Sequence, residues 1–218
     1  MRSWLAAILA VSVVAPASAI DSAADLAQAL QRKYDTVRDF SADFTQTYQS
    51  GVLRKLITEH GHVLIKKPGK MRWDYTEPEK KLFVSDGVKV YSYIPADRQV
   101  IVGTVPKDDG VGASILFLAG KGNIARDFTP SIGEVPPGSP PGSAALKLVP
   151  RVAQPDYDWL LLVIDRPSLA LRGLVTVDAQ GGKSSITFAN LKENVNPADK
   201  EFAFNIPRGV DVINDSSR

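Results

Sequence analysis

Few side chains in this sequence are suited to catalysis or to metal binding. The chain has no cysteine and only two histidines, His60 and His62. Thiol nucleophiles, disulfides and cysteine-based metal sites are therefore excluded, and a Ser-His pair would depend on one of two imidazoles. Residues two apart on a strand face the same way, so His60 and His62 could share a metal ion, whereas Glu59 would point to the opposite face. Two imidazoles without a third ligand make a poor metal site, and we expect none.

Nucleophilic catalysis has equally little support. Ser114 lies within the segment Gly112–Leu116, which lacks the second glycine of a nucleophile elbow. The acidic pair Asp108 and Asp109 lies in a Lys-Asp-Asp-Gly stretch that is typical of a turn. The sequence therefore predicts a protein that is not an enzyme and needs no cofactor, and a hydrolase is kept only as an alternative.

The composition is that of an ordinary globular domain. The 218 residues are 44% hydrophobic and 23% charged, values that favour a single domain. Lys and Arg number 26 against 24 Asp and Glu, for a formal net charge of +2. Because no large field of one sign results, we do not expect nucleic acid as a partner.

The first nineteen residues have the pattern of a secretory signal peptide. Arg2 supplies the positive start, Trp4–Ala15 is an apolar run, and Ala17-Ser18-Ala19 is a small-x-small cleavage site. The run is shorter than the roughly 20 residues that span a bilayer. We therefore predict cleavage after Ala19 and an exported mature chain, residues 20–218, that forms one domain.

The mature chain is expected to begin with a helix and to continue as strands. Ser22 and Asp25 resemble a capping box, and Leu26, Leu30 and Tyr34 recur at helical spacing. From Phe40 onward, apolar residues alternate with polar ones, which is typical of half-buried strands. The predicted strands cover 40–49, 57–66, 71–75, 81–85, 88–94 and 99–104, with a hairpin at Asp86-Gly87.

Further along, two helical pieces and a loop interrupt the strands. Val111–Ala119 contains four consecutive large apolar residues between glycines and predicts a short apolar helix, and Asn123–Phe128 a second one. Pro130–Ser143 holds five prolines and three glycines, which predicts a loop. Strand patterns resume at 145–149, 159–164, 169–177 and 184–193.

These elements predict a mainly β fold with a few helices. About ten or eleven antiparallel strands must curl into an incomplete barrel, because a flat sheet of that width would leave long unpaired edges. The N-terminal helix and the apolar segment Ile115–Leu118 are the available fillers of its concave face. Both segments could be part of the hydrophobic core, or they could cover a cavity that holds an apolar ligand. The sequence pattern does not distinguish these two interpretations.

Four segments then resemble one protein family. In chain order they are Phe40–Gln46 (FSADFTQ), Lys66–Tyr75 (KKPGKMRWDY), Ser85–Gly87 with the aromatic strand Tyr91–Pro95, and Phe202–Val212 (FAFNIPRGVDV). In this order behind a signal peptide, they resemble the periplasmic outer-membrane lipoprotein carriers of the lipoprotein-localisation pathway, from about Asp25 to Val212. The resemblance implies an incomplete β-barrel with a helical lid over an apolar cavity.

The resemblance also implies a function and partners. The family binds the acyl chains of lipoproteins released by an inner-membrane ABC-type transporter, and delivers them to an outer-membrane lipoprotein receptor. We expect a periplasmic monomer with that role. A periplasmic lipid-sensing regulator on the same half-barrel fold is the alternative, although such a regulator would carry an extra domain for which this chain has no spare length.

Candidate lipid-binding residues follow from strand parity and the resemblance together. Met71, Trp73 and Tyr75 share one strand face and would line an acyl pocket, or else form ordinary core. The full candidate cavity set is Met71, Trp73, Tyr75, Phe83, Tyr91, Tyr93, Trp159, Leu161 and Phe188. The underside of the lid would be Leu30, Tyr34, Ile115, Leu116 and Leu118.

One basic residue is expected to hold the lid closed. The family has a basic residue, usually Arg, directly before the proline that here is Pro68, where it donates hydrogen bonds to lid carbonyls. In this chain the position is Lys67. A lysine is a point charge with three flexible donors, whereas arginine is a planar fork. Lys67 is therefore either a lid lock or a solvated turn residue.

Overall fold

The computed structural model describes residues 22–52, 55–105, 122–154 and 157–215. The strands are β1 (Asp39–Gln49), β2 (Leu56–Lys66), β3 (Lys70–Glu77), β4 (Lys81–Asp86), β5 (Lys89–Ile94), β6 (Gln99–Thr104), β7 (Phe128–Ile132), β8 (Ser143–Pro150), β9 (Trp159–Asp165), β10 (Leu171–Val177), β11 (Lys183–Glu193) and β12 (Asp211–Asn214). The helices are α1 (Ala23–Thr36), α3 (Ile124–Asp127) and the 3-10 turn η1 (Asp199–Phe202).

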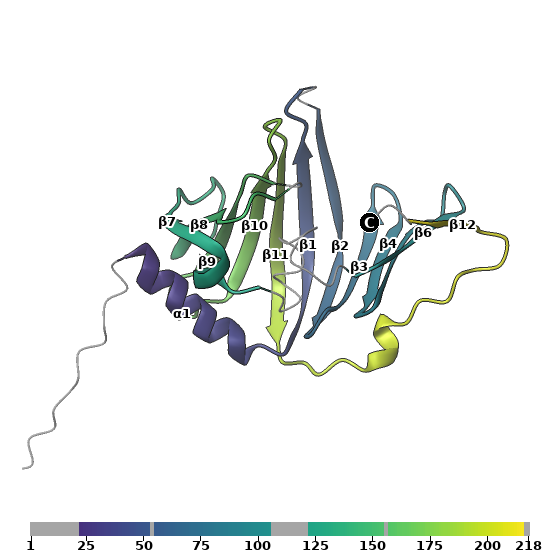
Figure 1. Ribbon diagram of the computed structural model, residues 1–218, viewed down its shortest axis with the longest axis horizontal. Helices are drawn as coiled ribbons and strands as arrows, with labels where there is room; N and C mark the ends of the chain where they lie inside the picture. Colours follow the sequence, from purple (N-terminus) through teal and green to yellow (C-terminus); the bar gives the residue numbers. More distant parts are fainter. Residues whose placement is uncertain (1–21, 53–54, 106–121, 155–156, 216–218) are drawn as a thin grey trace, which may run out of the picture.

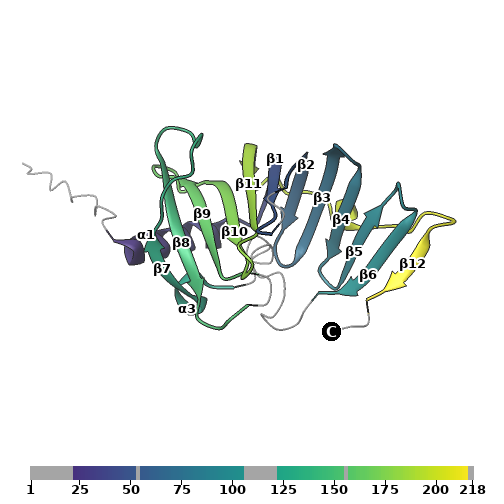
Figure 2. The same cartoon turned by 90° about the horizontal axis from the view of Figure 1, so that it is seen from above.

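The described strands form one twelve-stranded sheet in the order β12-β6-β5-β4-β3-β2-β1-β11-β10-β9-β8-β7. The sheet is open, with β7 and β12 far apart at its two edges (Figures 1 and 2). Neighbouring strands are antiparallel except at one edge, where β12 runs parallel to β6. The predicted mainly β architecture with helices and an unclosed sheet is confirmed.

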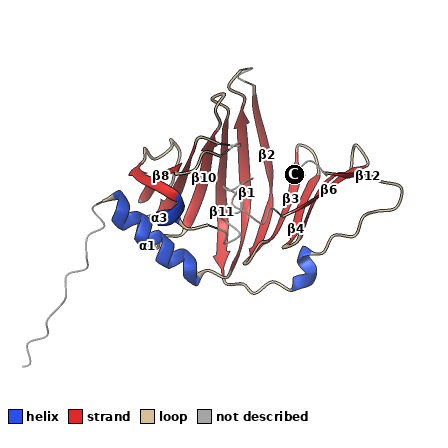
Figure 3. Cartoon of the chain, viewed as in Figure 1, coloured by secondary structure: helices blue, strands red, loops and turns tan. Residues whose placement is uncertain are grey.

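Helix α1 begins where the capping pattern predicts. Ser22 is its N-cap and accepts a hydrogen bond from the backbone N–H of Asp25. Its buried side chains include Leu26, Leu30 and Tyr34, which contribute to the same core as the central strands. The helix lies beside the half of the sheet that contains β7 and β8 (Figure 3).

Strand register defines the two faces of the sheet, because residues paired across neighbouring strands point to the same side. Trp73 pairs with Val63 of β2 and with Phe83 of β4. Phe44 pairs with Phe188 across β1 and β11, and its ring contacts that of Trp73. We call the face that carries Trp73 and Phe188, against which α1 packs, the inner face, and the opposite one the outer face.

The C-terminal segment crosses the outer face. Lys66 and Lys70 form ion pairs with Asp199, with N–O distances of 2.7 and 3.0 Å. The side chain of Phe202 is buried, and the ring of Phe204 lies 5.3 Å from that of Tyr91. The segment then ends in β12, which covers the free side of β6.

The structure differs from the prediction at both edges of the sheet. β7 starts at Phe128 and extends to Ile132, so it includes the first residues of the region predicted as a loop from Pro130. Proline is tolerated there because β7 is an edge strand, where a missing N–H need not break the ladder. The edge strand β12 was not predicted, so the sheet has twelve strands rather than ten or eleven. The predicted apolar helix 111–119 lies outside the described residues.

Candidate functional site

Aromatic rings form a continuous wall in the middle of the inner face. The Phe44 ring contacts Trp73 and Tyr75 edge-on, with centroid distances of 5.0 and 4.9 Å. The ring of Phe188 lies between those of Trp73 and Phe40, with centroid distances of 6.4 Å to Trp73 and 6.2 Å to Phe40. The wall therefore runs across β1, β3 and β11, the strands at the centre of the sheet.

A glycine makes room for this wall. Gly61 of β2 lies opposite both Phe44 and Tyr75. A Cβ at this position would come within 2.1 Å of the Asp74 carbonyl oxygen and 2.7 Å of the Phe44 ring. The ring can therefore lie over the strand only because residue 61 has no side chain.

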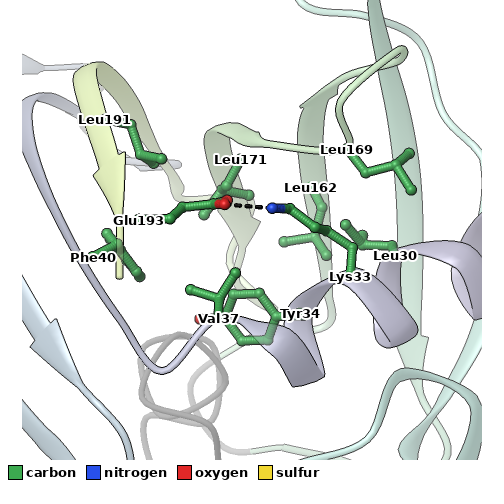
Figure 4. Close-up of a pocket in the computed structure, with 10 residues that line it drawn as sticks. All are labelled: Leu30, Lys33, Tyr34, Val37, Phe40, Leu162, Leu169, Leu171, Leu191 and Glu193. Atoms are coloured by element: carbon green, nitrogen blue, oxygen red, sulfur yellow. Dashed lines mark hydrogen bonds and ion pairs between the residues drawn. The ribbon is translucent and has the colours of Figure 1, made fainter. Parts of the chain in front are cut away.

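The wall continues into a small apolar pocket beneath α1 (Figure 4). Its lining residues are Leu30, Lys33, Tyr34, Val37, Phe40, Leu162, Leu169, Leu171, Leu191 and Glu193. The cavity volume is about 20 Å³, which holds about one water molecule. This pocket by itself therefore has no room for an acyl chain.

An ion pair joins α1 to the sheet at this pocket. Lys33 of α1 contacts the carboxylate of Glu193, at the end of β11 (Figure 4). The two side chains are 29% and 23% exposed, so the pair is partly shielded from water. It connects the helix to the strand across the pocket.

Lys67 makes a second connection to α1. Its Nζ donates to the backbone carbonyl of Tyr34 at 2.6 Å and lies 3.5 Å from the centre of the Tyr34 ring. The carbonyl is in the last turn of α1, where the negative end of the helix dipole favours a cation. Burial lowers the pKa of Lys67 to about 8, against the opposing effect of nearby Asp35 and Glu193. At neutral pH the side chain therefore still carries its proton.

A polar group borders the aromatic wall on the side away from α1. The Tyr75 hydroxyl donates to the side-chain oxygen of Gln46 at 2.7 Å, and the amide of Gln46 donates to Ser184 at 3.2 Å. Lys81 forms an ion pair with Glu59 and lies 4.8 Å from the centre of the Tyr75 ring. Burial, with a smaller effect of Glu59, raises the pKa of Tyr75 to about 12. The inner face is thus apolar toward α1 and polar at its other end.

Five of the nine candidate cavity residues lie together on the inner face. Met71, Trp73 and Tyr75 follow one another on β3, and Phe83 and Phe188 lie on the same side by register. Trp73, Met71 and Phe188 are buried in the main core, and Tyr75 and Phe83 pack against it. Their contact with a lipid stays a prediction.

The other four candidates lie on the outer face, so their placement in the same cavity was wrong. Ser92 is the residue of β5 that pairs with Phe83, which turns Tyr91 and Tyr93 to the opposite side, against Phe204. Leu162 belongs to the core with Trp73, whereas Trp159 and Leu161 form a separate cluster on the other side of β9. The four candidates on the outer face are Tyr91, Tyr93, Trp159 and Leu161.

The candidate lid residues divide into two groups. Leu30 and Tyr34 are buried on the underside of α1 and line the pocket. Burial, with a smaller effect of Glu193, raises the pKa of the Tyr34 hydroxyl. Ile115, Leu116 and Leu118 lie outside the described residues.

The two histidines lie on the outer face in hydrogen bonds between neighbouring strands. His62 Nδ1 is 2.9 Å from Asp43 and Nε2 is 3.0 Å from Ser41, and His60 is 3.0 Å from Thr45. Ser41, His62 and Asp43 contact one another in the order of a hydrolase triad. The three residues lie on the neighbouring strands β1 and β2, and His62 and Asp43 are exposed. In the described part of the chain, no three His, Asp or Glu side chains gather in a way that could hold a metal.

Several residues of the site were not predicted. Phe44, Lys33, Glu193 and Gln46 all contribute contacts at the wall, the pocket or the polar end. Phe44 could have been found, because it alternates in phase with Phe40 in the strand pattern. The Lys33–Glu193 pair joins residues far apart in sequence, and no local pattern indicates it. Within the described ranges, no helix combines the length and apolar character needed to span a bilayer.

Comparison with known proteins gives consistent results. The family model described as "Outer membrane lipoprotein carrier protein LolA" matches residues 35–205. An outer-membrane lipoprotein carrier protein of Methylococcus capsulatus is 32% identical over 83% of this chain and 84% of its own. An outer-membrane lipoprotein carrier protein of Methylobacillus flagellatus is 30% identical over 98% of this chain and 99% of its own.

A solved structure supports the fold. An uncharacterised conserved protein from Thermus thermophilus aligns with a TM-score of 0.52 at 14% identity, over 86% of this chain and 98% of its own. At this identity the likeness concerns the fold alone. The family match and the curated relatives extend over most of the sequence, and the chain belongs to the outer-membrane lipoprotein carrier family.

Proposed function

We propose that the protein carries lipoproteins across the periplasm by sheltering their acyl chains against the inner face of its sheet. The observation that supports this most directly is the aromatic wall, which continues into the pocket beneath α1. The relatives named outer-membrane lipoprotein carrier proteins favour this role over that of a lipid-sensing regulator.

The energetics explain why a carrier is needed. Burial stabilises a hydrocarbon chain by ~0.8 kcal/mol per CH₂, so one exposed chain of about sixteen carbons costs on the order of 10 kcal/mol in water. A lipoprotein with several such chains cannot diffuse freely between two membranes. A binding face that opens and closes can accept the chains and later expel them.

In this proposal, closure of α1 competes with the cargo. The ligand would contact Met71, Trp73, Tyr75, Phe83 and Phe188 after α1 has moved away. Leu30 and Tyr34 would cover the same face in the empty protein. Lys67, through its hydrogen bond to the Tyr34 carbonyl, would be the lock that favours the closed form.

The cellular route is also part of the proposal. Residues 1–19 would be removed as a signal peptide, and residues 20–218 would act as a monomeric domain in the periplasm. An ABC-type transporter of the inner membrane would load the carrier, and a receptor at the outer membrane would unload it. These partners follow from the carrier role of the family.

Native mass spectrometry of the protein purified from periplasm tests the function. We expect a fraction of the protein to carry a triacylated lipoprotein, and a synthetic triacylated peptide to displace a hydrophobic fluorescent probe. The unacylated peptide is the control and should leave the probe bound. Equal displacement by both peptides, or none by either, would contradict the proposal.

A further inference from the structure

The aromatic wall contains a buried hydrogen-bond donor that has no acceptor. The side chain of Trp73 is 2% exposed, and its indole Nε1 has no hydrogen-bond partner in the structure as described. A buried N–H without an acceptor is costly, and most proteins avoid it. An apolar ring of similar shape would fill this position without that cost, so the donor calls for an explanation.

Trp73 also lies at the boundary between the apolar and polar parts of the inner face. On its strand the next residue of the same face is Tyr75, whose hydroxyl donates to Gln46 and begins the polar group. In the other direction, Phe188 and then Phe40 lead from Trp73 to the pocket beneath α1. The side chain that carries the unpaired donor therefore lies between the apolar and the polar parts of the inner face.

A glycerolipid has the matching order of groups. Its hydrocarbon tails end at ester carbonyls, which accept hydrogen bonds but do not donate them, and the polar glycerol follows. With the tails along Phe188 and Phe40 toward α1, the carbonyls fall at Trp73 and the glycerol at Gln46 and Tyr75. A bare hydrocarbon would leave the indole N–H unpaired in the complex as well.

We propose that the indole N–H of Trp73 donates a hydrogen bond to an ester carbonyl of the bound lipid, and so sets both the orientation of the lipid and a preference for ester-linked chains. This inference rests on the proposed function, because it requires acyl chains on the inner face. It adds a recognition element for the ester group to a surface that otherwise offers apolar contact.

The test compares two lipids that differ in the carbonyls alone. Dipalmitoylglycerol has ester links, and dihexadecylglycerol has ether links with chains of the same length; both are measured by displacement of a hydrophobic fluorescent probe. For the wild type we expect about two- to tenfold tighter binding of the ester lipid, the range for one hydrogen bond. Trp73→Phe should bind the two lipids equally. Trp159→Phe, on the outer face, is the matched control and should keep the preference.

Stability provides an independent readout. Since Trp73→Phe removes an unpaired donor, we expect its melting temperature to fall less than a loss of ring volume alone would cause. If the variant does not fold, an NMR titration of the wild type with the two lipids takes its place, and the ¹H–¹⁵N indole resonance of Trp73 is followed. That resonance should move downfield with the ester lipid and not with the ether lipid.

The outcomes separate this inference from the function beneath it. If the wild type binds both lipids equally, or if Trp73→Phe keeps the ester preference, the role of the indole N–H is refuted while the carrier function stands. If the wild type binds neither lipid, the proposed function and this inference fail together.

Discussion

Lys67 is the residue whose replacement most directly tests how α1 is held. Lys67→Leu replaces the charged side chain with an aliphatic one and so removes the donor to the Tyr34 carbonyl. The Tyr34 carbonyl still accepts from the N–H of Val37 at 3.1 Å, so the variant leaves it with a hydrogen-bond partner. The change therefore measures the connection between Lys67 and α1 and little else.

The size of the effect follows from two opposing contributions. A hydrogen bond from a charged donor stabilises by about 1.5–3 kcal/mol, and a cation over an aromatic ring adds about 0.5–1 kcal/mol. The burial that lowers the pKa of Lys67 to about 8 offsets much of this. At pH 7 we expect a net loss of about 1 kcal/mol in Lys67→Leu, or about fivefold in the ratio of closed to open forms.

The pH dependence has a definite sign. The pKa of Lys67 is about 8 when α1 is closed and returns toward 10.5 when the side chain is released into water. Below pH 8 both forms hold the proton, and closure does not depend on pH. Between about pH 8 and 10.5 the closed form has lost a proton that the open form keeps, so rising pH favours closure. The neutral amine still donates to Tyr34, and the difference between wild type and Lys67→Leu should therefore grow with pH.

Site-directed spin labels can measure this equilibrium, because the chain has no cysteine of its own. One label at Gln28, on the exposed side of α1, and one at Thr187, exposed on β11, report the distance between helix and sheet. Lys67→Arg, which stays charged throughout, should show no pH dependence between pH 8 and 10.5. Distance distributions of Lys67→Leu that match the wild type at both pH 7 and pH 10 would refute the reasoning.

The same variant has a functional consequence. If closure of α1 competes with bound acyl chains, as proposed above, weaker closure should make the cargo stay on the carrier. We expect Lys67→Leu to accept lipoprotein released from spheroplasts but to transfer it poorly to the receptor. Normal transfer would show that Lys67 is a turn residue without a role in the lid.

Three further results are expected. Glu193→Gln should weaken the connection between α1 and β11 by about 0.5–1 kcal/mol. The helix-to-sheet label distances of the variant should therefore differ from those of the wild type at low salt, and this difference should disappear in 1 M salt, which screens the ion pair. Gly61→Ala should destabilise the fold by about 1–3 kcal/mol in denaturant melts, whereas Gly103→Ala, whose Cβ would meet nothing closer than 4.0 Å, should stay within about 1 kcal/mol. Intact-mass measurement of the exported protein should show a chain cut after Ala19; an uncut chain in membranes would contradict this.

The fold was largely predictable because its local signals agree with the tertiary structure. The cap at Ser22 and the alternation from Phe40 mark α1 and β1 correctly. The Asp86-Gly87 turn joins β4 and β5 as predicted. The edge strands were missed because β7 begins in a proline-containing stretch, and because β12 is a short exposed strand held by pairing with the distant β6.

The site was only partly predictable, since strand parity is visible only where one face of a strand is polar. In β3, Arg72 and Asp74 alternate with the apolar residues, and the inner face was identified correctly. β9 is buried on both faces, so its apolar residues do not alternate with polar ones, and the sequence does not show which face Trp159 and Leu161 occupy. In β5 the outer face is covered by Phe204 from the C-terminal segment, which makes an apolar outward residue such as Tyr91 look like core.

The strand order has a consequence for how the carrier is made. β1 to β6 are sequential neighbours, and so are β7 to β11, so each half of the sheet can assemble from local hairpins. The seam between β1 and β11 joins Phe44 to Phe188, residues far apart along the chain, and loop closure makes such a contact slow to form. The aromatic wall straddles this seam. Under the proposed function, a partly folded chain would lack the complete wall, and the ability to take cargo should appear only when the two halves have joined.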